Sequence, residues 1–340
     1  MPKGGVIMKK ILFVLFVTLF LVVSCAPPAI QPEEKEPTEV EPEKEAEPTI
    51  VGVSPGQILH NGIHTSQSRD LWVINTDGTG LMQLINKYVP AKWSPNGEKI
   101  VYLYSNRLFS MNPDASAKRE MRQGDKAITM FDWSSDSKYV LFEEGNGIGV
   151  EHMSNGLDLI LTGEKVDQQP EGKSPTYSEK DTIAFISENK IYKVDVNGDN
   201  TEEWLDLSSP SLLKASPNGL MLAFSDAGSF YIVPNEKATT DRTKVASSEA
   251  KNAEWSPDSK KIAYKTGSGK FYIYNVETKV TSTVDKNSQD NFAWSPDSKW
   301  LAFTYKSPDT YEDIWFVKAD GTGLRKFTNC PTACEKPSWG

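Results

Sequence analysis

Histidines and cysteines are the residue types in this chain that most often bind metals or transfer protons. His60 and His64 are four residues apart in a segment that reads as a β-strand, where a rise of about 3.3 Å per residue would separate them by roughly 13 Å. One metal ion could not then bind both. His152 stands alone, so the sequence predicts that all three histidines are ordinary strand or loop residues and that there is no metal site.

Cys330 and Cys334 enclose the short segment CPTAC near the end of the chain. A separation of four residues in a proline-containing turn can bring two sulfur atoms together, and an oxidising compartment favours a disulfide. Two free thiols or a redox pair remain the alternative. Metal binding would require further Cys or His residues nearby, and the spacing places none there.

The sequence gives no support for a known catalytic motif. Gly52–Gly56 (GVSPG) has the letters of Gly-x-Ser-x-Gly but belongs to a weaker copy of the repeated turn block described below, and there is no His-Glu-x-x-His zinc motif. Gly267–Lys270 (GSGK) lacks the spacing of a phosphate-binding loop and lies between two strand-like segments, which is typical of a hairpin turn. The sequence therefore predicts no catalytic residue and no cofactor. A net charge of -9 without a concentrated basic stripe also excludes nucleic acid as a partner.

The N-terminus has the layout of an export signal. Lys9 and Lys10 precede a thirteen-residue apolar run, Ile11–Val23, which is too short to span a bilayer core of about 30 Å as a helix. The end of this run and the two residues after it, Leu21–Cys25 (LVVSC), resemble the bacterial lipobox. In that motif the peptide is cut before the cysteine and the cysteine carries the lipid. Residues 1–24 are therefore predicted to be a signal peptide and Cys25 the lipidated residue, in contact with the membrane. A chance cysteine in a signal peptide that is cleaved further on is the alternative.

A proline- and glutamate-rich segment follows the cysteine. Residues 26–50 contain six Pro, eight Glu and no aromatic residue, so they cannot bury enough apolar surface to offset the entropy of ordering. Residues 25–50 are interpreted as the lipidated cysteine and an extended tether, which leaves residues 51–340 as the folded domain. An acidic binding motif is the alternative reading of the tether.

An internal repeat organises residues 51–340. The chain aligns on a Trp-Ser-Pro-Asp/Asn-Gly/Ser block, whose four strong copies have their tryptophans at Trp93, Trp133, Trp255 and Trp294. Weaker copies have Val53, Tyr177 and Ala215 at the same position, and Trp339 belongs to a final block. The spacing averages about 41 residues, in the range of propeller and solenoid repeats.

Each repeat predicts four short strands. Proline, Asp and Gly or Ser form the turn after the first strand, and two apolar strands and an outer strand follow. Because residues 51–340 show no helical pattern, we expect an all-β fold, a β-propeller of seven four-stranded blades, with six or eight blades as alternatives. Residues 335–339 have no blade of their own and are predicted to close the ring by pairing into blade one.

The tryptophans of the blocks, including Trp339, recur once per unit. A residue that recurs in this way is expected to pack between blades, whereas a ligand site would use unrepeated residues. An aromatic binding face is the alternative for Trp93, Trp133, Trp255, Trp294 and Trp339.

These blocks, with Asp77–Gly80 and Asp320–Gly323 (both DGTG), resemble the propeller repeats of the TolB family over about residues 53–339. The chain departs from that family in having a lipobox, a tether and seven units in place of an N-terminal α/β domain and six blades. The resemblance implies the fold and an extracytoplasmic, periplasmic or outer-membrane, setting.

The expected function is that of a lipid-anchored cell-envelope module that binds a protein or peptide at the central channel or a flat face, and not that of an enzyme. An enzyme of the propeller lactonase or quinoprotein type, with a site in the channel, is the first alternative. A glycan-binding surface lipoprotein is the second, for which Trp204 and Trp300 would be exposed aromatic residues.

Overall fold

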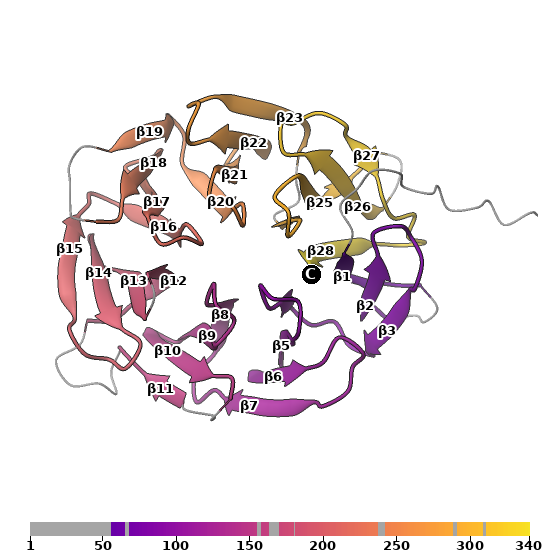
Figure 1. Cartoon of the computed structure of the whole chain (residues 1–340), viewed down its shortest axis with the longest axis horizontal. Coiled ribbons are helices and arrows are strands. Elements are labelled where there is room, and N and C mark those ends of the chain that lie inside the picture. The colour runs from indigo at the N-terminus through magenta and orange to yellow at the C-terminus, as the bar shows by residue number, and fades with distance from the viewer. Residues whose placement is uncertain are drawn as a thin grey trace, which may run out of the picture. The chain divides into compact units, whose positions relative to one another are not determined.

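Seven four-stranded antiparallel sheets form a ring in the computed structural model (Figure 1). The structure describes residues 56–64, 68–154, 158–162, 170–179, 181–236, 242–287, 291–308 and 311–340, and within these ranges there is no helix. The prediction of a seven-bladed β-propeller is confirmed. The described ranges accordingly hold no helix long and apolar enough to cross a membrane. The predicted signal peptide, Cys25 and the tether lie outside the described residues.

The blades follow one another along the chain, and the strands of each are named in order from the inner to the outer edge of the sheet. Blade 1 consists of β28 (Cys334–Trp339), β1 (Gln57–Gly62), β2 (Asp70–Asn75) and β3 (Met82–Ile85). Blade 2 consists of β4 (Ala91–Trp93), β5 (Ile100–Tyr104), β6 (Arg107–Met111) and β7 (Arg119–Gln123). Blade 3 consists of β8 (Ile128–Trp133), β9 (Tyr139–Glu144), β10 (Gly147–His152) and β11 (Asp158–Ile160). Blade 4 consists of β12 (Lys173–Glu179), β13 (Thr182–Ser187), β14 (Lys190–Asp195) and β15 (Glu202–Asp206).

The remaining three blades have the same order. Blade 5 consists of β16 (Pro210–Ala215), β17 (Met221–Asp226), β18 (Ser229–Pro234) and β19 (Thr243–Ala246). Blade 6 consists of β20 (Ala250–Trp255), β21 (Lys261–Thr266), β22 (Lys270–Asn275) and β23 (Thr281–Asn287). Blade 7 consists of β24 (Phe292–Trp294), β25 (Trp300–Lys306), β26 (Glu312–Lys318) and β27 (Arg325–Lys326).

The repeated block makes the turn between the first and second strands and also joins neighbouring blades. In blade 6, the Ser256 hydroxyl donates to Asp258 Oδ1 at 2.6 Å and accepts from the amide of Lys261 at 2.9 Å. Ser259 ends this turn with a φ of 61°, and its hydroxyl accepts from the amide of Asn218 in the turn of blade 5 at 3.0 Å. Serine in place of glycine at this position therefore adds a hydrogen bond between blades, which offsets the cost of its left-handed backbone.

The hydrophobic core is divided into seven clusters, each of which lies between two neighbouring blades. The tryptophans of the repeated block belong to these clusters and are all buried: Trp93, Trp133, Trp255, Trp294 and Trp339. Several of them also donate an indole hydrogen bond to the inner strand of the preceding blade; for example, Trp255 Nε1 donates to the carbonyl of Lys214 at 3.1 Å. The structure thus places these side chains where the blades pack together.

The C-terminal strand closes the ring. β28 pairs with β1, with Ile58 opposite Trp339, and Gln57 and Gly340 exchange two backbone hydrogen bonds of 2.8 and 2.9 Å. The Trp339 ring stacks on Phe316 of blade 7, with 4.9 Å between the ring centroids. The sequence prediction that this segment completes blade 1 is confirmed, and β28 pairs with the edge of β1 that would otherwise be open.

Candidate functional site

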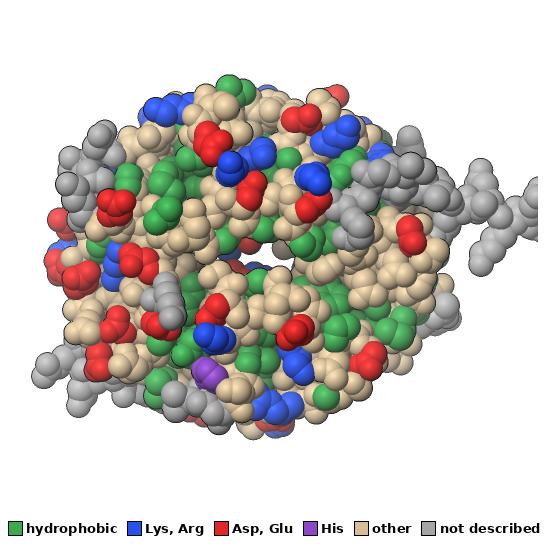
Figure 2. Space-filling view, viewed as in Figure 1, with side chains coloured by type: hydrophobic (Ala, Val, Ile, Leu, Met, Phe, Trp, Pro, Cys, Tyr) green, Lys and Arg blue, Asp and Glu red, His purple; other side chains and the backbone are tan. Residues whose placement is uncertain are grey.

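The inner strands surround a central opening, and acidic and basic side chains border it (Figure 2). The residue just before the aromatic position of each repeat is half-buried in all seven blades, whereas the aromatic position is usually buried. Asp132 of blade 3 and Lys214 of blade 5 lie 3.4 Å apart although blade 4 separates their strands, so at these positions the side chains reach the channel. We call these seven residues the channel ring: Lys92, Asp132, Thr176, Lys214, Glu254, Ala293 and Ser338.

Four members of the channel ring form a chain of ion pairs. Asp132 accepts from Lys92 Nζ at 2.8 Å and lies 3.4 Å from Lys214 Nζ, which is also 3.4 Å from Glu254. Asp132 belongs to blade 3 and Lys214 to blade 5, so their contact passes in front of Thr176 in blade 4. The chain therefore spans blades 2 to 6, while blades 7 and 1 contribute the small residues Ala293 and Ser338.

The ion pairs favour the charged forms of Asp132 and Lys214. Burial opposes the charged form of both residues, but Lys92 and Lys214 lower the pKa of Asp132, and Glu254 and Asp132 raise that of Lys214. Two lysines and two carboxylates leave the chain without net charge. Groups that stay ionised around neutral pH are poor proton donors and acceptors, so this arrangement suits recognition better than acid-base chemistry.

Sequence reasoning missed the channel ring, although the repeat alignment contains the signal. The position before the aromatic residue changes from Lys to Asp to Thr between blades while its neighbours recur. An unrepeated residue at a repeated position is where a repeat protein departs from blade packing. The repeat alignment could not predict the contact between Asp132 of blade 3 and Lys214 of blade 5, because that contact depends on the diameter of the ring.

His60 and His64 lie together, so the premise that no metal ion could contact both was wrong. Their Nε2 atoms are 2.8 Å apart, because β1 ends at Gly62 and the chain bends at His64. The extended rise assumed from the sequence applies only within the strand. The expectation that no histidine lies near the cysteines was also wrong, since His64 Nε2 is 3.9 Å from Cys330 Sγ and 3.6 Å from Cys334 Sγ.

These four residues, His60, His64, Cys330 and Cys334, form what we call the His–Cys cluster. Their ligand atoms all lie within 4.8 Å of one another, and the cluster is the group of metal-binding side chains found in the described part of the chain. The two cysteines are joined in a disulfide, as predicted, with 5.9 Å between their Cα atoms. The cluster lies where β1 and β28 meet blade 7, so it joins the two ends of the propeller.

Burial keeps both histidines of the cluster neutral. It lowers the pKa of His60 to about 3, with a further contribution from His64 and an opposing one from the backbone of Ile58. Burial also lowers the pKa of His64, which is half-buried. A neutral imidazole has a free lone pair, which is the form that binds metals.

His152 is not part of this cluster. It lies at the end of β10 in blade 3, where its Nδ1 accepts from the amide of Ser154 at 3.2 Å and its ring contacts Tyr139 edge-on.

Trp204 and Trp300 do not form an exposed aromatic surface, so this part of the glycan-binding alternative was wrong. Each is only 6% exposed. Lys193 Nζ lies 4.8 Å from the ring centroid of Trp204, and the Arg325 guanidinium lies 4.4 Å from that of Trp300. Cationic side chains therefore cover the faces that would stack on a sugar.

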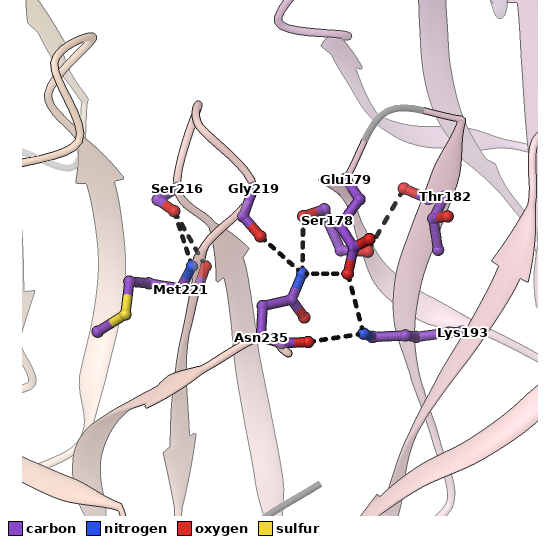
Figure 3. Close-up of polar contacts among 8 residues, drawn as sticks. All are labelled: Ser178, Glu179, Thr182, Lys193, Ser216, Gly219, Met221 and Asn235. Carbon is purple, nitrogen blue, oxygen red and sulfur yellow. Dashed lines mark hydrogen bonds and ion pairs between the residues drawn. The ribbon is translucent and has the colours of Figure 1, made fainter. Parts of the chain in front are cut away.

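A second polar cluster joins blades 4 and 5 (Figure 3). The buried Lys193 donates to the carbonyl of Asn235 at 3.0 Å, and its Nζ is 3.4 Å from Glu179. The Asn235 amide nitrogen donates in turn to the carbonyls of Ser178 and Gly219, at 2.8 Å each. The Lys193 ammonium group and the Asn235 amide nitrogen are both bonded within the cluster. This is the pattern of a structural network that joins two blades.

Comparison with known proteins places the chain by its fold. No family model matches it, and no curated protein matches it. Among solved structures, it is similar to oligogalacturonate lyase from Vibrio parahaemolyticus (TM-score 0.57, 12% identity, 80% of this chain and 86% of that one). It is also similar to TolB from Acinetobacter baumannii, with a TM-score of 0.51 and 13% identity over 83% of this chain and 82% of that one. A chain of a mitotic checkpoint complex has a TM-score of 0.56 and 19% identity over 72% of this chain and 80% of that one. At these identities the likeness shows a shared β-propeller fold, with TolB among the structures that share it.

Proposed function

We propose that this chain is a lipid-anchored cell-envelope propeller that binds a protein or peptide segment at its central channel. The observation that carries the proposal is the channel ring, in which a repeated structural position has a different residue in each of several blades. Its half-buried charges are held in place by one another and remain accessible from the channel.

The chemistry of the channel ring favours a polypeptide partner. Paired lysines and carboxylates line blades 2 to 6, and the small residues Ala293 and Ser338 of blades 7 and 1 leave room for a side chain. A partner with both acidic and basic side chains could exchange ion pairs with Asp132 and Lys214 without adding net charge to the channel. A polyanion would not gain from a ring whose charges balance.

The cellular setting rests on the N-terminal sequence. Leu21–Cys25 supplies the predicted lipidation motif, and residues 26–50 supply a spacer that reaches up to about 3.1 Å per residue where it adopts polyproline II. Together they would display the propeller at a distance from the membrane. Replacing Cys25 by Ala should move the protein from the membrane fraction to the soluble fraction, and continued dependence on detergent would contradict the lipid anchor.

A channel enzyme has less support. Lactonase- or quinoprotein-type chemistry needs carboxylates or a cofactor that converge on a substrate. The two carboxylates of the channel ring, Asp132 and Glu254, both lie in ion pairs with lysine. The likeness to an oligogalacturonate lyase concerns the fold and does not transfer that activity.

Affinity capture with matched variants tests the binding proposal. The double variant Asp132→Asn/Lys214→Gln removes the contact across the channel without changing net charge. The control Lys260→Gln/Glu277→Gln makes a similar change at an exposed ion pair of blade 6, whose atoms are 3.1 Å apart. A partner recovered from solubilised envelopes should be lost with the first variant and kept with the control. Equal recovery with both variants would contradict binding at the channel.

A further inference from the structure

We propose that the His–Cys cluster is a zinc site: when Cys330 and Cys334 are thiols, they bind one Zn²⁺ ion together with His60 and His64. The disulfide and the zinc site would then be alternative states of the same two sulfur atoms. The disulfide lies within the C-terminal segment, whereas the zinc ion would also link that segment to the first strand through His60.

The residue types and spacings are those of a structural zinc site. Such sites use four Cys or His ligands in two pairs, with two to four residues between the cysteines and three to five between the histidines. In this chain three residues separate Cys330 from Cys334, and three separate His60 from His64. The ring topology brings the two pairs together from opposite ends of the domain.

The distances from His64 to the sulfur atoms are close to those of a zinc tetrahedron. With Zn–N of about 2.1 Å and Zn–S of about 2.3 Å, a tetrahedron places nitrogen and sulfur ligands about 3.6 Å apart, and it requires the two sulfur atoms, once reduced, to separate to about 3.8 Å. His64 Nε2 lies 3.6 and 3.9 Å from the two sulfur atoms. The two Nε2 atoms, at 2.8 Å, would need to separate by about half an ångström. His64 is half-buried and lies beyond the end of β1, so it can make that shift more easily than the fully buried His60.

The surrounding residues hold the ligands in position. Gly62 is paired with Cys334, and a Cβ atom at Gly62 would lie 2.8 Å from Cys334 Sγ, so glycine permits the close approach of the strands. The amide of Cys330 donates at 2.9 Å to Asp313, a buried carboxylate of blade 7. These contacts fix the backbone on both sides of the cluster, so metal binding would mainly require movement of the sulfur atoms and of His64.

The chemistry balances for a dithiol reductant. Reduction transfers two electrons and two protons to the disulfide and leaves two thiols, while the reductant becomes a disulfide. Zinc binding then releases the two thiol protons to solvent, and the histidines bind through the lone pairs of neutral Nε2 atoms. A disulfide oxidant would accept two electrons from the thiolates and become a dithiol, which would re-form the Cys330–Cys334 bond and release the metal.

Metal binding by the full chain in detergent tests the proposal. Dithiol-reduced protein, freed of reductant and dialysed against Zn²⁺ without oxygen, should retain one zinc per chain more than the Cys330→Ser/Cys334→Ser variant, which keeps Cys25. Oxidised protein should show no such excess. Co²⁺ added to the reduced protein should give the visible bands of tetrahedral cobalt and the near-ultraviolet absorption of thiolate ligands.

Alanine variants of two histidines, one inside and one outside the cluster, give a matched comparison. His64→Ala should weaken zinc binding by ~100-fold or more, because loss of a mere supporting contact already costs about 10–100-fold. His152→Ala, outside the cluster, should bind like the wild type. Reduced wild-type protein that shows no excess zinc over the double-serine variant would overturn the proposal. So would a His64→Ala variant, folded by circular dichroism, that binds zinc as tightly as the wild type.

Discussion

Removing the C-terminal strand should strongly destabilise the propeller. Deletion of residues 335–340 takes away most of β28, including the Trp339 side chain, which is 7% exposed and stacks on Phe316. Loss of a buried tryptophan alone costs about 3–5 kcal/mol. The deletion also removes the two backbone hydrogen bonds between Gln57 and Gly340. Each such bond contributes a net stabilisation of about 1 kcal/mol.

A cost of about 5 kcal/mol corresponds to a fall in Tm of about 10 °C, since a domain of this size loses roughly 2 °C per kcal/mol. Thermal unfolding followed by circular dichroism measures it. Trp339→Ala should account for half or more of the shift, and Leu220→Ala, at a side chain that is 57% exposed, should leave Tm within ~1 °C. A deletion variant with Tm within ~2 °C of the wild type would refute the closure argument, because removal of an unpaired tail is close to neutral.

Three further predictions concern contacts between and within blades. Ser259→Ala should lower the free energy of unfolding by about 1 kcal/mol, because the hydrogen bond from the Asn218 amide is lost and the left-handed backbone is kept. Ser259→Gly should lower it less, because glycine relieves the backbone strain, and equal melting temperatures of the two variants would contradict this. Trp255→Phe should cost about 1–3 kcal/mol by leaving the carbonyl of Lys214 without its indole donor, and a denaturant midpoint equal to that of the wild type would count against it. Burial opposes ionisation of Asp226, but hydrogen bonds from two loop amides and from Arg242 outweigh burial and lower the pKa of Asp226. The ionised carboxylate therefore contributes its full stability above the unfolded-state pKa of about 3.9, and this contribution is lost as the pH falls below that value. The melting temperature of Asp226→Asn should therefore vary less with pH below pH 4 than that of the wild type, and parallel curves would contradict the assignment.

Much of the fold follows from the sequence because the repeat carries it. The Trp-Ser-Pro-Asp block encodes both the turn after the inner strand and the side chain that packs between blades, so counting blocks counts blades. The segment around Trp339 has the same pattern without a blade of its own, and it pairs with β1 as expected.

The sites were harder to predict because they depend on contacts across the ring. The expected backbone separation of roughly 13 Å led to the wrong conclusion for His60 and His64, whose Nε2 atoms lie 2.8 Å apart, since strand geometry was assumed beyond Gly62. A glycine between two histidines, together with the matching spacing of Cys330 and Cys334, was the available signal. The glycan-binding alternative required Trp204 to be exposed, but it is buried, and Lys193 from the neighbouring strand lies over its ring.

Contact at the channel wall is the most direct test of the proposed binding function. A photo-crosslinking residue at Ala293, a half-buried member of the channel ring, should yield a discrete crosslinked partner in intact cells. The same residue at Val280, which is 58% exposed and lies between β22 and β23, should not. A crosslink from Val280 and none from Ala293, in variants that melt like the wild type, would contradict a channel-binding module.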